Sequence, residues 1–180
     1  FDTLEKAGYR IPPIHNPTRW WRPDVLVELL VLRESIDQLQ NKEHRDFFRL
    51  ALAGVLVPDL TNVTLGRLQL HFINRDEDRI EPLEIFRLHA NGMISDVRKV
   101  QALDHVGNAT ALLQDSTNLD KISLGRKVDC VITSPPYPNR YSYIWNTRPH
   151  LYLFGFFDNA QQASAVDKKT IGGTWGTATS

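Results

Sequence analysis

The sequence has almost no sulfur and no excess charge of either sign, and both features limit what the protein can do. Its 180 residues include one cysteine, Cys130, and one methionine, Met93. A single cysteine cannot form an intramolecular disulfide or a cysteine-based zinc cluster, and it favours a reducing cytoplasm as the compartment. Because 21 basic and 21 acidic residues cancel, any binding to a polyanion must use local basic patches.

Long apolar runs and metal-binding motifs are also missing. No apolar run has the length of a membrane span, so no membrane partner is expected. The histidines are scattered without the spacing of a zinc site, and the sequence therefore predicts no metal. These histidines are His15, His44, His71, His89, His105 and His150.

The first hundred residues have the apolar spacing of helices. One predicted helix follows Pro23, which suits a first helical turn, and a second stops before Pro58. A third is predicted from Ile85 to Val106 with a break near Asn91-Gly92, and Thr61 to Ile73 is ambiguous between a loop and a short strand. The apolar faces of the first two helices are formed by Leu29, Leu32, Ile36 and Leu39, and by Phe47, Phe48, Ala51, Leu52, Val55 and Leu56.

From Ala109 the pattern changes to short buried strands. Ala109 to Leu113 and Val128 to Thr133 read as strands, joined through a loop or short helix at Leu119 to Leu124. Two apolar strands joined by a crossover suggest a parallel sheet, where ligands sit beyond the carboxyl ends of the strands. Asp115 falls there, either as a cofactor contact or as a helix-capping aspartate. Cys130, within the second strand, is predicted to be a small core residue.

The second strand leads directly into Ser134-Pro135-Pro136-Tyr137. The Ser134 hydroxyl and the Pro135 carbonyl can accept hydrogen bonds from the two hydrogens of an exocyclic amino group, which localises its nitrogen lone pair. Tyr137 can stack on the same planar ring. The competing interpretation is an ordinary strand-to-loop exit with a rigid turn. A proline pair alone is weak support for a motif, because a second pair occurs at Pro12-Pro13.

Thr133 to Tyr137 resembles the catalytic motif of amino-methylating, S-adenosylmethionine-dependent DNA methyltransferases. The resemblance implies an α/β fold, with a partial Rossmann-like methyltransferase sheet preceded by a helical insertion or subdomain. Residues 1–105 would form the helical part and residues 106–180 part of the catalytic core, with Ser134, Pro135, Pro136 and Tyr137 as catalytic residues. It further implies S-adenosyl-L-methionine as cofactor, double-stranded DNA with a flipped target base as substrate, and a restriction-modification or phage-defence partner. Serine at the first position favours cytosine N4 over adenine N6.

One feature of such enzymes is absent from the sequence. A glycine-rich loop after a first strand lets the backbone approach the cofactor, and the nearest candidate, Gly172 to Gly176, does not follow a predicted strand. We therefore expect this chain to be part of a longer enzyme whose cofactor loop precedes Phe1. On its own it should bind S-adenosylmethionine weakly or not at all.

Further candidates for nucleic-acid contacts are Arg140 and Tyr141 after the motif, and Arg19 and Trp20 near the start. Arg19, Trp20, Trp21 and Arg22 could form a stacking and phosphate-binding patch, but packing of the tryptophans in the core is favoured. Three alternatives remain for the function: a non-catalytic DNA-binding or assembly module, a methyltransferase acting on a protein glutamine or RNA, and a plain structural domain.

Overall fold

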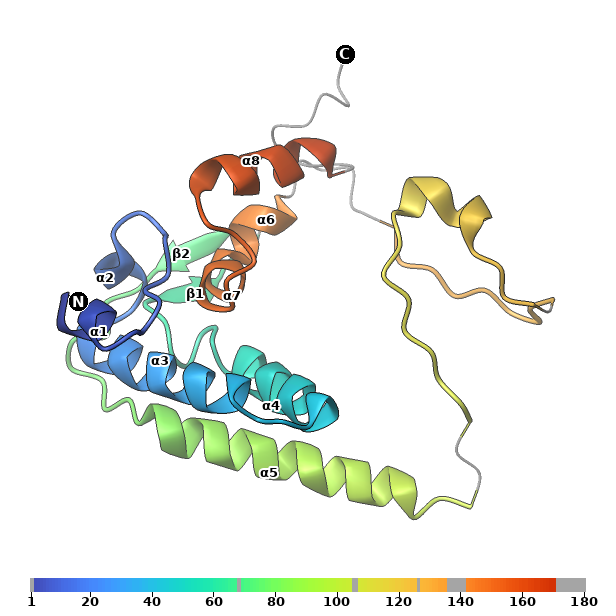
Figure 1. Cartoon of the computed structure of the whole chain (residues 1–180), viewed down its shortest axis with the longest axis horizontal. Helices are drawn as coiled ribbons and strands as arrows, with labels where there is room; N and C mark the ends of the chain where they lie inside the picture. Colours follow the sequence, from blue (N-terminus) through green and yellow to red (C-terminus); the bar gives the residue numbers. More distant parts are fainter. Residues whose placement is uncertain (1, 68, 105–106, 126, 136–141, 171–180) are drawn as a thin grey trace.

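Helices dominate the structure, a computed structural model that describes residues 2–67, 69–104, 107–125, 127–135 and 142–170 (Figure 1). The elements are α1 (Asp2–Lys6), α2 (Pro17–Trp20), α3 (Pro23–Asp37), α4 (Lys42–Gly54), β1 (Val63–Leu65), β2 (Leu70–Phe72), α5 (Pro82–Gln101), the 3-10 helix η1 (Ser116–Lys121), α6 (Tyr143–Asn146), α7 (Arg148–Leu153) and α8 (Ala160–Lys169).

Helices α3 and α4 pack against each other and form a helical hairpin. Pro23 occupies the first turn of α3, where its missing N–H has no helical partner to lose. Asn41 caps α4, because its side chain accepts a hydrogen bond from the His44 amide at 2.9 Å. Leu29 of α3 and Leu52 of α4 are fully buried in the shared core. The prediction of two amphipathic helices is confirmed.

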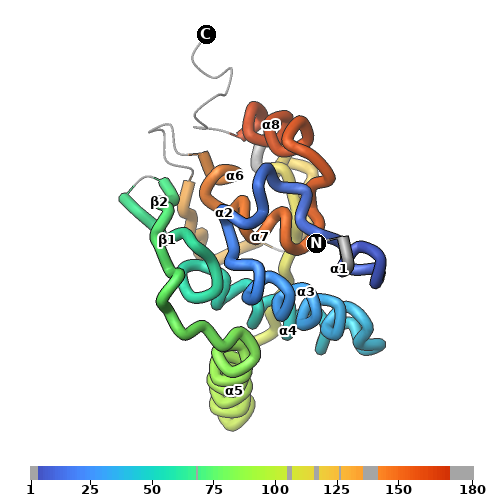
Figure 2. The backbone as a smooth tube through the Cα atoms, turned by 90° about the vertical axis from the view of Figure 1, so that its left-hand side faces the viewer, coloured from blue at the N-terminus to red at the C-terminus, as the bar shows by residue number. Residues whose placement is uncertain are grey.

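Helix α5 is continuous, so the predicted break at Asn91-Gly92 is wrong. It packs along α4, with the rings of Phe48 and Phe86 6.2 Å apart and with Ala90 buried. A glycine in a helix costs only about 1 kcal/mol relative to alanine, and these contacts offset that cost. Figure 2 shows α5 nearly end-on below α3 and α4.

A short antiparallel hairpin occupies the segment that the sequence left ambiguous. Val63 of β1 pairs with Phe72 of β2, and Leu65 pairs with Leu70. Val63 is fully buried and belongs to the same hydrophobic core as α3 and α4. The hairpin is therefore packed against these two helices.

The C-terminal helices return to this core. Leu153 and Phe157 are buried in the same cluster as Trp21. The buried guanidinium of Arg33 donates to the Leu153 carbonyl and to the Arg10 carbonyl, each at 2.9 Å. Residues on both sides of the predicted boundary between 105 and 106 thus share one core, and the assignment of two domains stays a prediction.

Residues 107–125 and 127–135, which we call the arm, lie apart from the packed helices (Figure 1). The predicted strands Ala109–Leu113 and Val128–Thr133 are irregular and exposed here, and Ile132 keeps 95% of its surface accessible. A strand is stabilised by lateral hydrogen bonds and by burial of its apolar face, and no described strand runs beside either segment. The prediction of a short helix or loop at Leu119–Leu124 overlaps η1.

Within the described ranges, the only sheet is the hairpin β1-β2. The Rossmann-like sheet therefore stays a prediction. The longest helix, α5, spans 20 residues, but neither it nor any other described helix has the length and apolar content needed to cross a membrane.

Candidate functional site

The predicted catalytic motif begins at the end of the arm. Ser134 and Pro135 are exposed and have irregular backbone. Pro136 and Tyr137 lie outside the described residues, and so do the predicted nucleic-acid contacts Arg140 and Tyr141. The structure thus presents the first two hydrogen-bonding residues of the motif to solvent, where a ligand could reach them.

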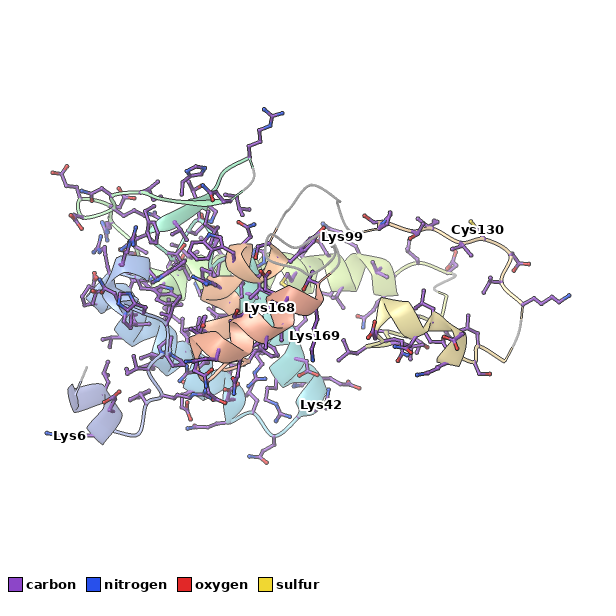
Figure 3. The ribbon with its side chains drawn as sticks, turned by 90° about the horizontal axis from the view of Figure 1, so that it is seen from above. Lys6, Lys42, Lys99, Cys130, Lys168 and Lys169 are labelled. Carbon is purple, nitrogen blue, oxygen red and sulfur yellow. The ribbon has the colours of Figure 1, made fainter. Side chains whose placement is uncertain are left out.

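The sequence also led to predictions for two other residues of the arm, Asp115 and Cys130. Asp115 immediately precedes η1 and is exposed, and its carbonyl accepts a hydrogen bond from the Asn118 amide at 3.0 Å. This position suits the start of a helical turn, and the cofactor contact stays a prediction. Cys130 is exposed, so its predicted core position is wrong in this structure, because its segment is irregular and no described strand lies beside it. Figure 3 shows it on the arm, away from the packed helices.

The predicted patch around Arg19 and Trp20 is largely a packing contact. Trp20 is only 4% exposed, and its ring meets the Phe72 ring edge-on with centroids 5.0 Å apart. The Arg19 guanidinium lies 4.0 Å above the same Phe72 ring. The buried Trp20 ring has no open face for stacking on a base, which favours the packing interpretation. Arg19 itself is exposed.

A connected polar group follows the motif in the sequence. The Ser142 hydroxyl accepts a hydrogen bond from the Trp145 amide at 3.0 Å, which caps α6. The same hydroxyl donates to Asp167 Oδ1 at 2.6 Å, and Asp167 is buried on α8. This bond ties the beginning of α6 to α8, directly after the segment that carries the motif.

Arg148 lies on the same surface. Its guanidinium carbon stands 3.8 Å from the centroid of the Trp145 ring. Its Nε atom is buried and has no hydrogen-bond partner in the described part of the chain. Burial lowers the pKa of the Arg148 guanidinium, while Tyr152 and Asp167 oppose that shift. An arginine nonetheless stays charged at neutral pH. We call Ser142, Trp145, Arg148 and Asp167 the Arg148 platform.

His150 links α7 to the helical hairpin. Its Nε2 atom lies 3.1 Å from the Ala53 carbonyl. A carbonyl can only accept, so Nε2 carries the proton and Nδ1 is the bare nitrogen of a neutral ring. Nδ1 is buried without a partner among the described residues, and burial lowers the pKa of His150. His150 is therefore a structural histidine that is stable in its neutral form.

A separate shallow hollow of about 590 Å³ lies between α5 and the end of α4. Its lining includes the charged residues Asp59, Arg75 and Asp96, and also His89. In the part of the chain that the structure describes, no group of three or more histidine, cysteine or acidic side chains is arranged to hold a metal ion. None of the residues predicted as functional from the sequence lines this hollow.

Sequence reasoning missed Arg148 and Asp167. The signal for Arg148 was its position three residues after Trp145, a spacing at which side chains of a helical segment meet. Asp167 had no such signal, because only the return of α8 to α6 reveals its partner, Ser142.

We compared the chain with models of known protein families, with curated proteins and with solved structures. None of the three gave a match.

Proposed function

We propose that this chain carries the catalytic motif of an S-adenosylmethionine-dependent DNA methyltransferase that modifies an exocyclic amino group. The observation that supports the proposal is the sequence Ser134-Pro135-Pro136-Tyr137, whose first two residues are exposed at the end of the arm. An exposed hydroxyl and carbonyl are able to meet a base that has left its duplex. The proposal includes a cytoplasmic enzyme of a restriction-modification or phage-defence system.

The motif residues would act on the amino group of the base. The Ser134 hydroxyl oxygen accepts one amino hydrogen, and the Pro135 carbonyl accepts the other. With both hydrogens held, the nitrogen lone pair is no longer delocalised into the ring and becomes nucleophilic. Tyr137 stacks on the ring and holds it in the position where these two hydrogen bonds form.

The hollow between α4 and α5 is not proposed as the cofactor site. Asp115, the predicted contact, is exposed on the arm, and the hollow between α4 and α5 contains none of the motif residues. We therefore propose a role for the motif residues in the capture and activation of the base, and the cofactor contact of Asp115 stays a prediction.

Cytosine N4 is the proposed target rather than adenine N6. Ser134 is small and uncharged, and it can accept a hydrogen bond from the amino group of either base. The preference rests on the resemblance to enzymes with serine at the first motif position. Mass spectrometry of nucleosides from DNA modified by the enzyme will distinguish the products. N4-methylcytosine is expected, N6-methyladenine would correct the base alone, and 5-methylcytosine as sole product would reject the mechanism.

A single substitution tests the role of the motif. The full-length protein should be expressed and assayed for methyl transfer to DNA. Ser134→Ala should lower turnover by about a hundredfold to a thousandfold, because one preorganised acceptor is lost. DNA affinity should change much less, since the acceptor acts mainly as the lone pair localises.

Ser123→Ala is the matched control, because Ser123 is another exposed serine on the arm. It should retain the turnover of the unmodified protein. Equal activity of Ser134→Ala and Ser123→Ala would remove Ser134 from the mechanism. DNA binding without any methyl transfer would instead favour the non-catalytic DNA-binding alternative.

A further inference from the structure

The Arg148 platform has an arginine whose hydrogen-bonding capacity is not used within the described part of the chain. The guanidinium carbon of Arg148 lies over the Trp145 ring, 3.8 Å from its centroid, and this contact restricts the motion of the guanidinium. No ion pair involves Arg148 among the described residues, and its buried Nε has no acceptor. Holding the guanidinium against a ring beforehand reduces the entropy lost when it binds an anion.

Asp167 is the carboxylate that acts on Arg148, and it already accepts a hydrogen bond from another residue. Asp167 Oδ1 accepts the Ser142 hydroxyl at 2.6 Å, so this bond holds α6 against α8. Asp167 acts on Arg148 electrostatically without a hydrogen bond between them. Its negative charge offsets part of the attraction that Arg148 exerts on an anion.

Two further cations follow Asp167 in the sequence. Lys168 and Lys169 form the basic last turn of α8, and both are exposed. Figure 3 shows them on α8, the helix that packs on α6. The charges of Arg148, Lys168 and Lys169 outnumber that of Asp167. In a chain with a net charge of zero, such a local excess of positive charge is what binding to a polyanion requires.

We propose that Arg148, held over the Trp145 ring, binds a backbone phosphate of the DNA strand whose base enters the Ser134-Pro135-Pro136-Tyr137 motif, with Lys168 and Lys169 contributing to the same field. This inference rests on the proposed function. It follows from three observations: the guanidinium that lies over Trp145 with unfilled donors, the basic last turn of α8 directly after Asp167, and the position of the platform in the sequence shortly after the motif. A planar guanidinium suits a phosphate because its parallel N–H groups can bind two oxygens at once.

Salt-dependent DNA binding tests the proposal. Fluorescence anisotropy of a labelled oligonucleotide, single-stranded and duplex, gives the slope of log K against log salt concentration. Arg148→Gln should reduce that slope by about 0.7 for single-stranded or about 0.9 for duplex DNA, the value for one phosphate contact. At about 0.1 M salt this corresponds to about five- to eightfold weaker binding. Arg87→Gln is the control, because Arg87 is exposed on α5 and already paired with Glu84.

Two further variants keep the test decisive if Arg148→Gln fails to fold. Arg148→Lys retains the charge and should retain the slope, but it should weaken binding because the planar fork is lost. Replacing both Lys168 and Lys169 by glutamine changes only exposed side chains, and it should lower the slope as well. An unchanged slope in this double variant together with unchanged affinity in Arg148→Lys would overturn the proposal.

An anion of the same chemistry is also present in S-adenosylmethionine, as its carboxylate. A titration with S-adenosylmethionine distinguishes the two sources. If Arg148→Gln lost affinity for S-adenosylmethionine while its DNA slope stayed unchanged, the DNA assignment would be wrong. If the unmodified protein binds DNA and Arg148→Gln binds it equally well, only the role of Arg148 is rejected. If the unmodified protein neither binds nor methylates DNA, the proposed function itself fails, and this inference fails with it.

Discussion

Arg33 provides the sharpest test of how the C-terminal helices are held to the rest of the protein. It lies on the buried stripe of α3, with 5% of its surface exposed. Its guanidinium donates to carbonyls of residues far apart in the sequence, Arg10 and Leu153. The nearest carboxylate oxygen, on Glu34, is 3.9 Å away. The guanidinium therefore acts as a cross-link made of hydrogen bonds to the backbone.

Arg33→Met removes the guanidinium and keeps a side chain that fills much of the stem's volume. Hydrogen bonds from a charged donor contribute about 1.5–3 kcal/mol each, so two of them amount to about 3–6 kcal/mol. Burying the cation costs part of this, as the pKa of Arg33 shows by its downward shift, which is caused mainly by burial. We expect a net loss of about 2–4 kcal/mol in the free energy of unfolding.

Urea denaturation followed by tryptophan fluorescence measures this loss, because Trp20 and Trp21 are buried in the core that Arg33 borders. Arg79→Met is the matched control. The Arg79 side chain is 89% exposed, and its ion pair with Glu81 at 2.5 Å should contribute less than about 1 kcal/mol. If Arg33→Met unfolded at the same urea concentration as Arg79→Met, the cross-link would have no role in stability.

Two further predictions concern buried rings. Burial lowers the pKa of His150 from its ordinary value of 6.5, so the unfolded chain binds a proton at this residue first as the pH falls. The contribution of His150 to the free energy of unfolding should be constant above this pH and should decline below it, by at most about 1.4 kcal/mol per pH unit. His150→Gln should remove this part of the pH dependence in denaturation curves, and replacing the exposed His15 should leave it in place. Trp20→Ala should cost about 3–5 kcal/mol of stability as a buried aromatic, whereas the milder Trp20→Phe should leave DNA affinity within about twofold. A selective loss of DNA affinity in a fully folded Trp20→Phe protein would restore the stacking interpretation.

The helices of the first hundred residues were predictable because their signals are local. Pro23 marks the first turn of α3, and apolar residues spaced by three and four mark the face that packs. The same local reasoning placed a break at Asn91-Gly92, and it failed there because the contacts of Phe86 and Ala90 with the rest of the core hold α5 together. Local propensity is a weak prior when tertiary packing opposes it.

The buried polar contacts were not predictable from spacing. Arg33 occupies a position on the apolar stripe of α3, and a pattern of apolar residues gives no reason to bury a cation there. Its partners, the Arg10 and Leu153 carbonyls, come from the two ends of the described chain. Ser142 and Asp167 are likewise 25 residues apart and meet only through the packing of α8 on α6. Such pairs depend on the tertiary fold.

The conformation of the arm determines whether Ser134 and Pro135 can act as the proposed acceptors. Hydrogen-bond acceptors lower an activation barrier only when their positions are fixed before the reaction, since otherwise the ordering cost falls on the reaction itself. Ser134 follows Val131 and Ile132, two apolar residues that are largely exposed in the described arm. Burying an exposed valine or isoleucine contributes about 1.5–3 kcal/mol each, so covering both would supply about 3–6 kcal/mol toward ordering the neighbouring backbone. Ser134 and Pro135 can therefore act as preorganised acceptors only when the apolar run before them is packed, and the proposed catalytic step is tied to the formation of the strand that the sequence predicts.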